Sequence, residues 1–209
     1  MDAHIARLCV LYEDLRLELL AIAADSIPPL DILDPLDEAG INPYVGKSRR
    51  NYFLRRSIGT LHEFAEGVRL VDTCAAFSEI KAAFDGPTAQ MWDSAATFFR
   101  TKEAEIKQLR NDVGGHFGSK ATIYAVLRLS PDAVGFIEIV AHVKSEPGDF
   151  RLRFVGEIAA TAFMRHLLGS TSDKKVGAFF TGSLMPGFRH ATECVQVIAA
   201  NYLWHRFGR

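Results

Sequence analysis

Hydrophobic residues recur at helical spacing over most of this chain. In residues 4–24 the apolar side chains return at steps of three and four, which is the pattern of one buried face of an amphipathic helix. The same period is found in the further segments 48–70, 73–84, 90–113, 152–169 and 191–207. Most of the chain is therefore predicted to be helical.

Turn-forming residues separate these segments. Residues 25–46 contain four prolines and two glycines and are predicted to be an acidic loop. Thr88 is the predicted N-cap of the long helix that begins near Gln90, and Gly114-Gly115 is expected to end or bend that helix. Residues 170–189 are a predicted Gly/Ser loop with an apolar middle at 178–188, a possible docking surface.

One part of the chain changes its period. Residues 121–129 and 134–143 alternate and are rich in β-branched side chains, and the turn sequence Ser-Pro-Asp-Ala at 130–133 joins them. The fold class predicted is mainly α: an up-and-down bundle of five or six helices with a β-hairpin inserted at about 121–143. We expect residues 1–209 to form a single domain.

Charge and composition narrow the classes of function. The chain of 209 residues has 24 Lys+Arg against 25 Asp+Glu, a net charge of -1, which excludes a protein that coats nucleic acid by bulk electrostatics. No apolar run approaches the ~20 residues that span a bilayer, and acidic residues near the N-terminus argue against export. Three widely separated cysteines suit a reducing compartment. We therefore expect a cytoplasmic protein with no membrane partner.

A local basic patch is nevertheless present. Residues 1–40 hold two basic and nine acidic residues, a net charge of -7, whereas 47–56 contain no acid. The cations of this basic run are Lys47, Arg49, Arg50, Arg55 and Arg56. They are candidate substrate-binding residues. The alternative is a solvated helix face, or a surface that pairs with the acidic N-terminal segment.

The polar residues at the end of the long helix are the strongest candidate site. Arg110, Asn111, Asp112 and His116 bring a cation, an amide, a carboxylate and an imidazole next to the flexible Gly114-Gly115 pair. Arg110 and His116 would not point together on a regular helix, because six residues give about 240° of rotation. A bend at the glycines would let them converge. The alternative is an ordinary helix C-cap.

This segment resembles the Arg-x(4-6)-His signature of the HEPN (higher eukaryotes and prokaryotes nucleotide-binding) superfamily. The resemblance implies an all-α bundle that pairs as a homodimer, with Arg110, Asn111 and His116 in a cleft between two copies. Many members of that superfamily are metal-independent endoribonucleases of toxin or defence type, which work with an antitoxin or another protein partner. Others have lost catalysis and bind only a nucleotide or a partner.

The chemistry is consistent with that resemblance. RNA cleavage by the 2′-hydroxyl needs a base, an acid and a positive group on the phosphate, with no cofactor. His116 is then the expected general acid or base and Arg110 the expected phosphate clamp, oriented by Asn111 and Asp112. A two-fold dimer would supply the second histidine.

Three alternatives stay open. The pair Arg55 and His62 also matches the spacing and shares one helix face, so His62 is a second candidate histidine. The chain would otherwise be a catalytically inactive HEPN-like module that binds a nucleotide or protein, or a protein with a small-molecule pocket between bundle and hairpin.

Two other kinds of site are not expected. Residues 40–48 approach the phosphate-loop pattern, but five residues rather than four separate the glycines and no strand precedes them. The seven histidines and three cysteines show no metal-ligand spacing, so no metal site is predicted.

Overall fold

The computed structural model describes residues 1–23, 42–114, 137–140, 149–152 and 180–207, and the single residues 123, 127 and 178. Within these ranges the protein is mainly α-helical, as the hydrophobic pattern predicts. The α-helices are α1 (Asp2–Ala23), α2 (Asn42–Asp72), α3 (Ala75–Ala82), α4 (Gly86–Leu109) and α8 (Met185–Phe207). Two short π-helical turns adjoin them: η2 (Arg110–Gly114) follows α4, and η3 (Phe180–Leu184) precedes α8.

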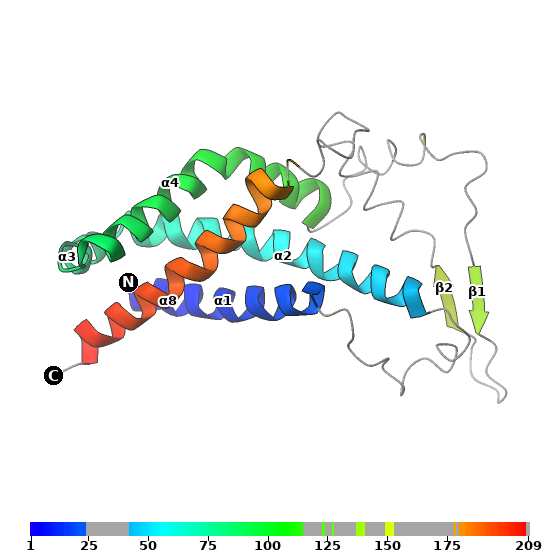
Figure 1. Cartoon of the computed structure of the whole chain (residues 1–209), viewed down its shortest axis with the longest axis horizontal. Helices are drawn as coiled ribbons and strands as arrows, with labels where there is room; N and C mark the ends of the chain where they lie inside the picture. The colour runs from blue at the N-terminus through cyan, green and yellow to red at the C-terminus, as the bar shows by residue number, and fades with distance from the viewer. Residues whose placement is uncertain are drawn as a thin grey trace.

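The long helices pack side by side as a bundle (Figure 1). α1, α2 and α4 alternate in direction, and α8 crosses them obliquely. α1 and α4 each contact both α2 and α8, so the four helices close around a common core. None of the helices in the described ranges is long and apolar enough to cross a membrane.

Aromatic side chains fill the centre of the bundle. The rings of Phe64 on α2 and Phe99 on α4 lie 5.9 Å apart, and Phe77 on α3 lies 4.6 Å from Trp92 on α4. The indole Nε1 of Trp92 donates a hydrogen bond to Asp72 at 2.7 Å, so this buried ring leaves no polar atom unsatisfied. The positions of α4 predicted to face inward are confirmed as buried: Trp92, Ala95, Phe99, Ile106 and Leu109.

Two interfaces of α1 hold the ends of the described chain together. A Cβ atom at Gly67 of α2 would lie 2.7 Å from Leu8 Cδ2, so any larger residue here would require the Leu8 side chain to move. The hydroxyl of Tyr202 on α8 donates a hydrogen bond to the carboxylate of Asp2. α1 therefore packs against both α2 and α8.

Two helices begin earlier than predicted. α2 starts at Asn42, not near Ser48, because proline is tolerated in a first helical turn and Pro43 is the second residue of the helix. α4 starts at Gly86, and its N-cap is Asp85, which accepts a hydrogen bond from the backbone N–H of Thr88 at 2.8 Å. Thr88 lies inside the helix, so its predicted role as N-cap was wrong.

The predicted loop 170–189 is helical at its C-terminal end. α8 begins at Met185 and has Pro186 in its first turn. Leu184 and Phe188 are 1% and 4% exposed and belong to the core. The interpretation of 178–188 as an apolar docking surface is therefore wrong for these two side chains, because the bundle already buries them.

A short antiparallel ribbon lies apart from the helices along the chain. β1 (Ile137–Val140) pairs with β2 (Asp149–Leu152), with Ile137 opposite Leu152. The predicted strand 121–129 and the turn 130–133 lie outside the described residues, except for residues 123 and 127, so the predicted hairpin at about 121–143 stays a prediction. The predicted helix 152–169 also lies outside them, apart from Leu152, which is the last residue of β2.

Two leucines of α1 provide a matched test of the bundle. Leu15 is 0% exposed and Leu17 is 58% exposed. We expect Leu15→Ala to lower the free energy of unfolding by about 2–5 kcal/mol, because it leaves a cavity in the core. Leu17→Ala should change it by less than about 0.5 kcal/mol. Urea denaturation followed by circular dichroism measures both, and equal losses would contradict the packing of α1 described here.

Candidate functional site

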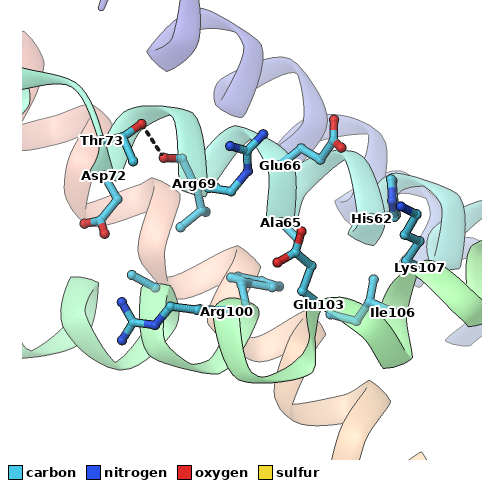
Figure 2. A pocket seen from close by; sticks show the side chains of 13 residues that line it. His62, Ala65, Glu66, Arg69, Asp72, Thr73, Arg100, Glu103, Ile106 and Lys107 are labelled. Carbon is cyan, nitrogen blue, oxygen red and sulfur yellow. Dashed lines mark hydrogen bonds between the residues drawn. The ribbon is translucent and has the colours of Figure 1, made fainter.

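A groove runs between α2 and α4 (Figure 2). Its volume is about 330 Å³, which is within the range of ligand-binding sites. Small side chains leave this space, since Ala65 and Ala96 line it where larger residues would fill it. Val68, Phe99 and Ile106 complete an apolar floor.

Charged side chains alternate along both walls of the groove. On α4 the order is Arg100, Glu103 and Lys107, and on α2 it is Arg69, Glu66 and His62. Residues three or four apart share one helix face, so each wall presents a cation, then an acid, then a second basic group.

The charged ends of the two walls point in different directions. In Figure 2 the side chains of Arg69 and Glu66 lie next to each other on α2 and point away from α4, whereas Glu103 reaches from α4 towards α2 and Arg100 extends towards the N-terminal end of α4. No ion pair within the described chain involves these four residues or Lys107. Arg100 only donates a 3.4 Å hydrogen bond to Thr97 on its own helix. The charges of the groove are therefore not neutralised by each other.

His62 lies at one end of the groove, close to Lys107 (Figure 2). Its side chain is 16% exposed, and its Nδ1 atom lies 3.9 Å from Glu63 Oε1. That atom has no hydrogen-bond partner among the described residues. Glu63 is itself paired with Arg7 of α1. Of the two candidate histidines, His62 is the one that the structure places next to cations of the groove.

The segment predicted as the site begins just beyond this end of the groove. The α-helix ends at Leu109, earlier than the predicted Val113, and Arg110–Gly114 form the π-helical turn η2, which packs against α2. π-Helical turns occur frequently at functional sites. Arg110 and Asn111 are exposed, and the Arg110 Nη1 donates a hydrogen bond to Asn111 Oδ1 at 3.2 Å. The side chains of Arg110 and Asn111 are therefore in direct contact, and their proposed roles stay predictions.

The remaining predicted residues are only partly brought together. Asp112 is half-buried in η2, whereas His116 lies outside the described residues. Of the basic run, Lys47, Arg49 and Arg50 lie in the first part of α2, and Arg55 follows as a half-buried residue. The Nε atom of Arg56 lies 3.6 Å from Glu18 Oε1, which matches the alternative that this run pairs with the acidic N-terminal segment.

The charged walls of the groove were not predicted from the sequence. A signal was present, because Glu66, Arg69, Arg100, Glu103 and Lys107 flank the inward positions of two amphipathic helices at steps of three and four. Such a stripe is also typical of an ordinary solvated surface. Only the antiparallel contact of α2 with α4 turns two stripes into one groove.

Glu18 is a buried acid at the α1–α2 interface. It is 6% exposed and accepts a hydrogen bond from the Thr60 hydroxyl at 3.1 Å, whereas its Oε2 atom has no hydrogen-bond partner in the described ranges. Burial raises the pKa of Glu18 above its ordinary value of 4.5, although Thr60 and Arg56 act in the opposite direction. No group of three or more potential metal ligands occurs among the residues that the structure describes.

The raised pKa of Glu18 predicts a pH-dependent stability. The folded chain binds this proton more tightly than the unfolded chain, so the carboxyl destabilises the fold increasingly as the pH rises from about 4.5 through the raised pKa. Glu18→Gln keeps an oxygen that accepts from Thr60 and removes the charge. We expect equal stability of variant and wild type below about pH 4.5, and a more stable variant near neutral pH, measured by urea unfolding across this range. A wild type that gains on the variant as the pH rises would show that the Arg56 ion pair outweighs burial.

Comparison with known proteins assigns no relative to this chain. No protein-family model, no curated protein and no solved structure matches it. The functional interpretation therefore rests on the residues of the groove and of η2.

Proposed function

We propose that this chain is a HEPN-like helical-bundle protein that binds single-stranded RNA in the α2–α4 groove and cleaves it at residues 110–116. One observation carries the proposal: Arg100, Lys107 and Arg110 follow one another along α4 and η2, from the groove to the Arg-Asn pair, and none forms an ion pair within the described residues. Unpaired guanidinium and ammonium groups are the side chains that bind phosphate.

A single strand fits the groove better than a duplex. The space of about 330 Å³ between two packed helices is nucleotide-sized, and its apolar floor offers a surface for a base rather than for a phosphate. Phosphates belong at the charged walls. An unstacked single strand can place a base on the apolar floor and its phosphates at the charged walls at the same time. The bases of a duplex are already paired and cannot reach the floor.

The cleavage chemistry follows from the residues of the motif. His116 removes the proton from a ribose 2′-hydroxyl, whose oxygen attacks the adjacent phosphorus. The bond from phosphorus to the 5′-oxygen breaks, that oxygen takes a proton, and a cyclic 2′,3′-phosphate and a 5′-hydroxyl result. Arg110 stabilises the charge on the phosphate oxygens, and Asn111 holds the guanidinium through its 3.2 Å hydrogen bond.

A second acid-base group is needed to protonate the leaving oxygen. In a homodimer, His116 of the other copy would supply it by symmetry. Within one chain, His62 is the competing candidate, since it lies at the end of the groove beside Lys107. Catalytically inactive binding of a nucleotide or a protein partner is the alternative outcome that the experiments below separate.

The proposed activity predicts RNA cleavage that persists in EDTA. We expect His116→Ala to lower the rate by about 10²–10⁴-fold, because a general acid-base group is lost. Arg110→Lys should keep part of the activity and Arg110→Ala little, since lysine retains the charge but not the planar set of donors. Gel analysis of labelled single-stranded RNA measures the rate, with circular dichroism as the folding control.

Three other results would change the proposal. Full cleavage by His116→Ala together with loss in His62→Ala would move the catalytic role to His62. RNA binding without cleavage by the wild type would leave the inactive-module alternative. Cleavage by both histidine variants at the wild-type rate would contradict the proposed site.

The groove cations also predict a salt dependence of RNA binding. Each cation that contacts a phosphate of single-stranded RNA adds about 0.7 to the slope of log affinity against log salt. Arg100→Gln and Lys107→Gln should each reduce that slope by about this amount. Arg189→Gln removes a cation from an exposed position of α8 that does not line the groove, and it should leave the slope unchanged. Fluorescence anisotropy at several salt concentrations makes the comparison, and an equal effect of all three variants would exclude the groove as the RNA site.

A further inference from the structure

Phosphate binding alone does not account for the two glutamates that line the groove, Glu66 and Glu103. We propose that Glu66 and Glu103 make the groove selective for nucleobases that carry an amino group, so that cytosine, adenine and guanine bind and uracil is disfavoured. This inference rests on the proposed function, since it requires RNA in the groove. It adds a base specificity that the motif at 110–116 does not contain.

The carboxylates of Glu66 and Glu103 can only accept hydrogen bonds, which limits what they can bind. An ionised carboxylate only accepts hydrogen bonds, and so does a phosphodiester. Glu66 and Glu103 therefore repel the backbone of RNA and can contact it favourably only through its donors. Those donors are the amino groups of bases and the 2′-hydroxyls of the riboses.

Neither Glu66 nor Glu103 forms an ion pair with a cation in the described chain. Other acids of the same two helices are paired: Glu63 with Arg7, Asp93 with Lys81 and Glu105 with Lys102. Asp72, the third acid of the groove, accepts the hydrogen bond of Trp92. In the described chain neither Glu66 nor Glu103 has an ion pair or a hydrogen bond of this kind. Both thus keep their acceptor capacity for a ligand.

Each of the two glutamates lies between two basic residues of its own helix. Along α4, Glu103 lies about 4.5 Å from the level of Arg100 and about 6 Å from that of Lys107. α2 repeats this order with Arg69, Glu66 and His62. Cations at both ends hold successive phosphates, and the base between them meets the acids. Figure 2 shows the Glu103 side chain reaching from α4 towards α2 beside Ala65, over the apolar floor.

Base chemistry then decides the preference. Cytosine and adenine present an amino group, and guanine presents an amino group beside a ring N–H, so each donates to a carboxylate. Uracil presents carbonyl oxygens on both sides of a single N–H, and these oxygens face the carboxylates with like polarity. One such contact corresponds to a preference on the order of tenfold.

The test compares two uncleavable ligands. Oligocytidine and oligouridine of equal length, both 2′-O-methylated, carry the same phosphates, offer no 2′-hydroxyl donor and cannot be cleaved by 2′-attack. We expect the wild type to bind the oligocytidine about tenfold more tightly in fluorescence anisotropy. Glu66→Gln/Glu103→Gln should bring the ratio close to one, mainly by tightening oligouridine binding, because an amide can donate to the uracil carbonyl oxygens that the carboxylates repel.

A matched control isolates the groove from net charge. Glu79→Gln/Glu193→Gln, on α3 and α8, also removes two negative charges, at exposed positions that do not line the groove. It should keep the wild-type ratio. Because all four glutamates are exposed, both double variants should fold.

The outcomes separate this inference from the proposed function. A wild-type ratio near one, or a ratio that survives in the double variant, overturns the base selectivity and leaves RNA cleavage untouched. A tenfold preference without any cleavage of 2′-hydroxyl RNA supports the selectivity and removes the nuclease. Binding of neither oligonucleotide overturns both.

Discussion

The packing of α2 against α1, α3, α4 and α8 is the constraint on which the rest of the structure depends. Its buried side chains form a continuous strip from the middle of the helix to its end: Ile58, Leu61, Phe64, Val68 and Val71. A helix that is buried along this strip cannot rotate without exposing it to water. The phase of every other α2 side chain is thereby determined, including those that reach the groove.

The groove follows from that phase. Glu66 and Arg69 are exposed because they lie at the edge of the buried strip, and Glu103 and Lys107 have the same relation to the buried Phe99 and Ile106 of α4. The two edges meet where Ala65 and Ala96 are too small to close the gap. A charged surface is thus held by a rigid apolar base, whose packing fixes the positions from which Glu66, Arg69, Glu103 and Lys107 extend.

The buried faces of single helices could be predicted from local periodicity. Features that depend on the packing of two helices against each other could not. The apolar stripe of α4 is buried as predicted, and in α1 Ile5, Leu8 and Leu15 are buried while the rest of the stripe is half-buried, because burial follows a period of 3.6 residues. The start of α8 was missed, because Leu184 and Phe188 are buried by tertiary packing that overrides a Gly/Ser-rich neighbourhood. Arg110 and Asn111 were selected from their residue types, and their roles stay predictions. The groove requires the packing of α2 against α4, which no single segment contains. His116 lies outside the described residues, and its role stays a prediction.

The contact between Tyr202 and Asp2 has a kinetic consequence. It joins residues 200 positions apart, and α1 packs along α8 as well as along α2. Contacts of such high sequence separation form late, because the loop-closure entropy must first be overcome. The hairpin of α1 and α2 can assemble before α8 is made, but its apolar side stays exposed until α8 packs on it. A chain that has not yet made α8 therefore has a hydrophobic surface that is open to non-specific association.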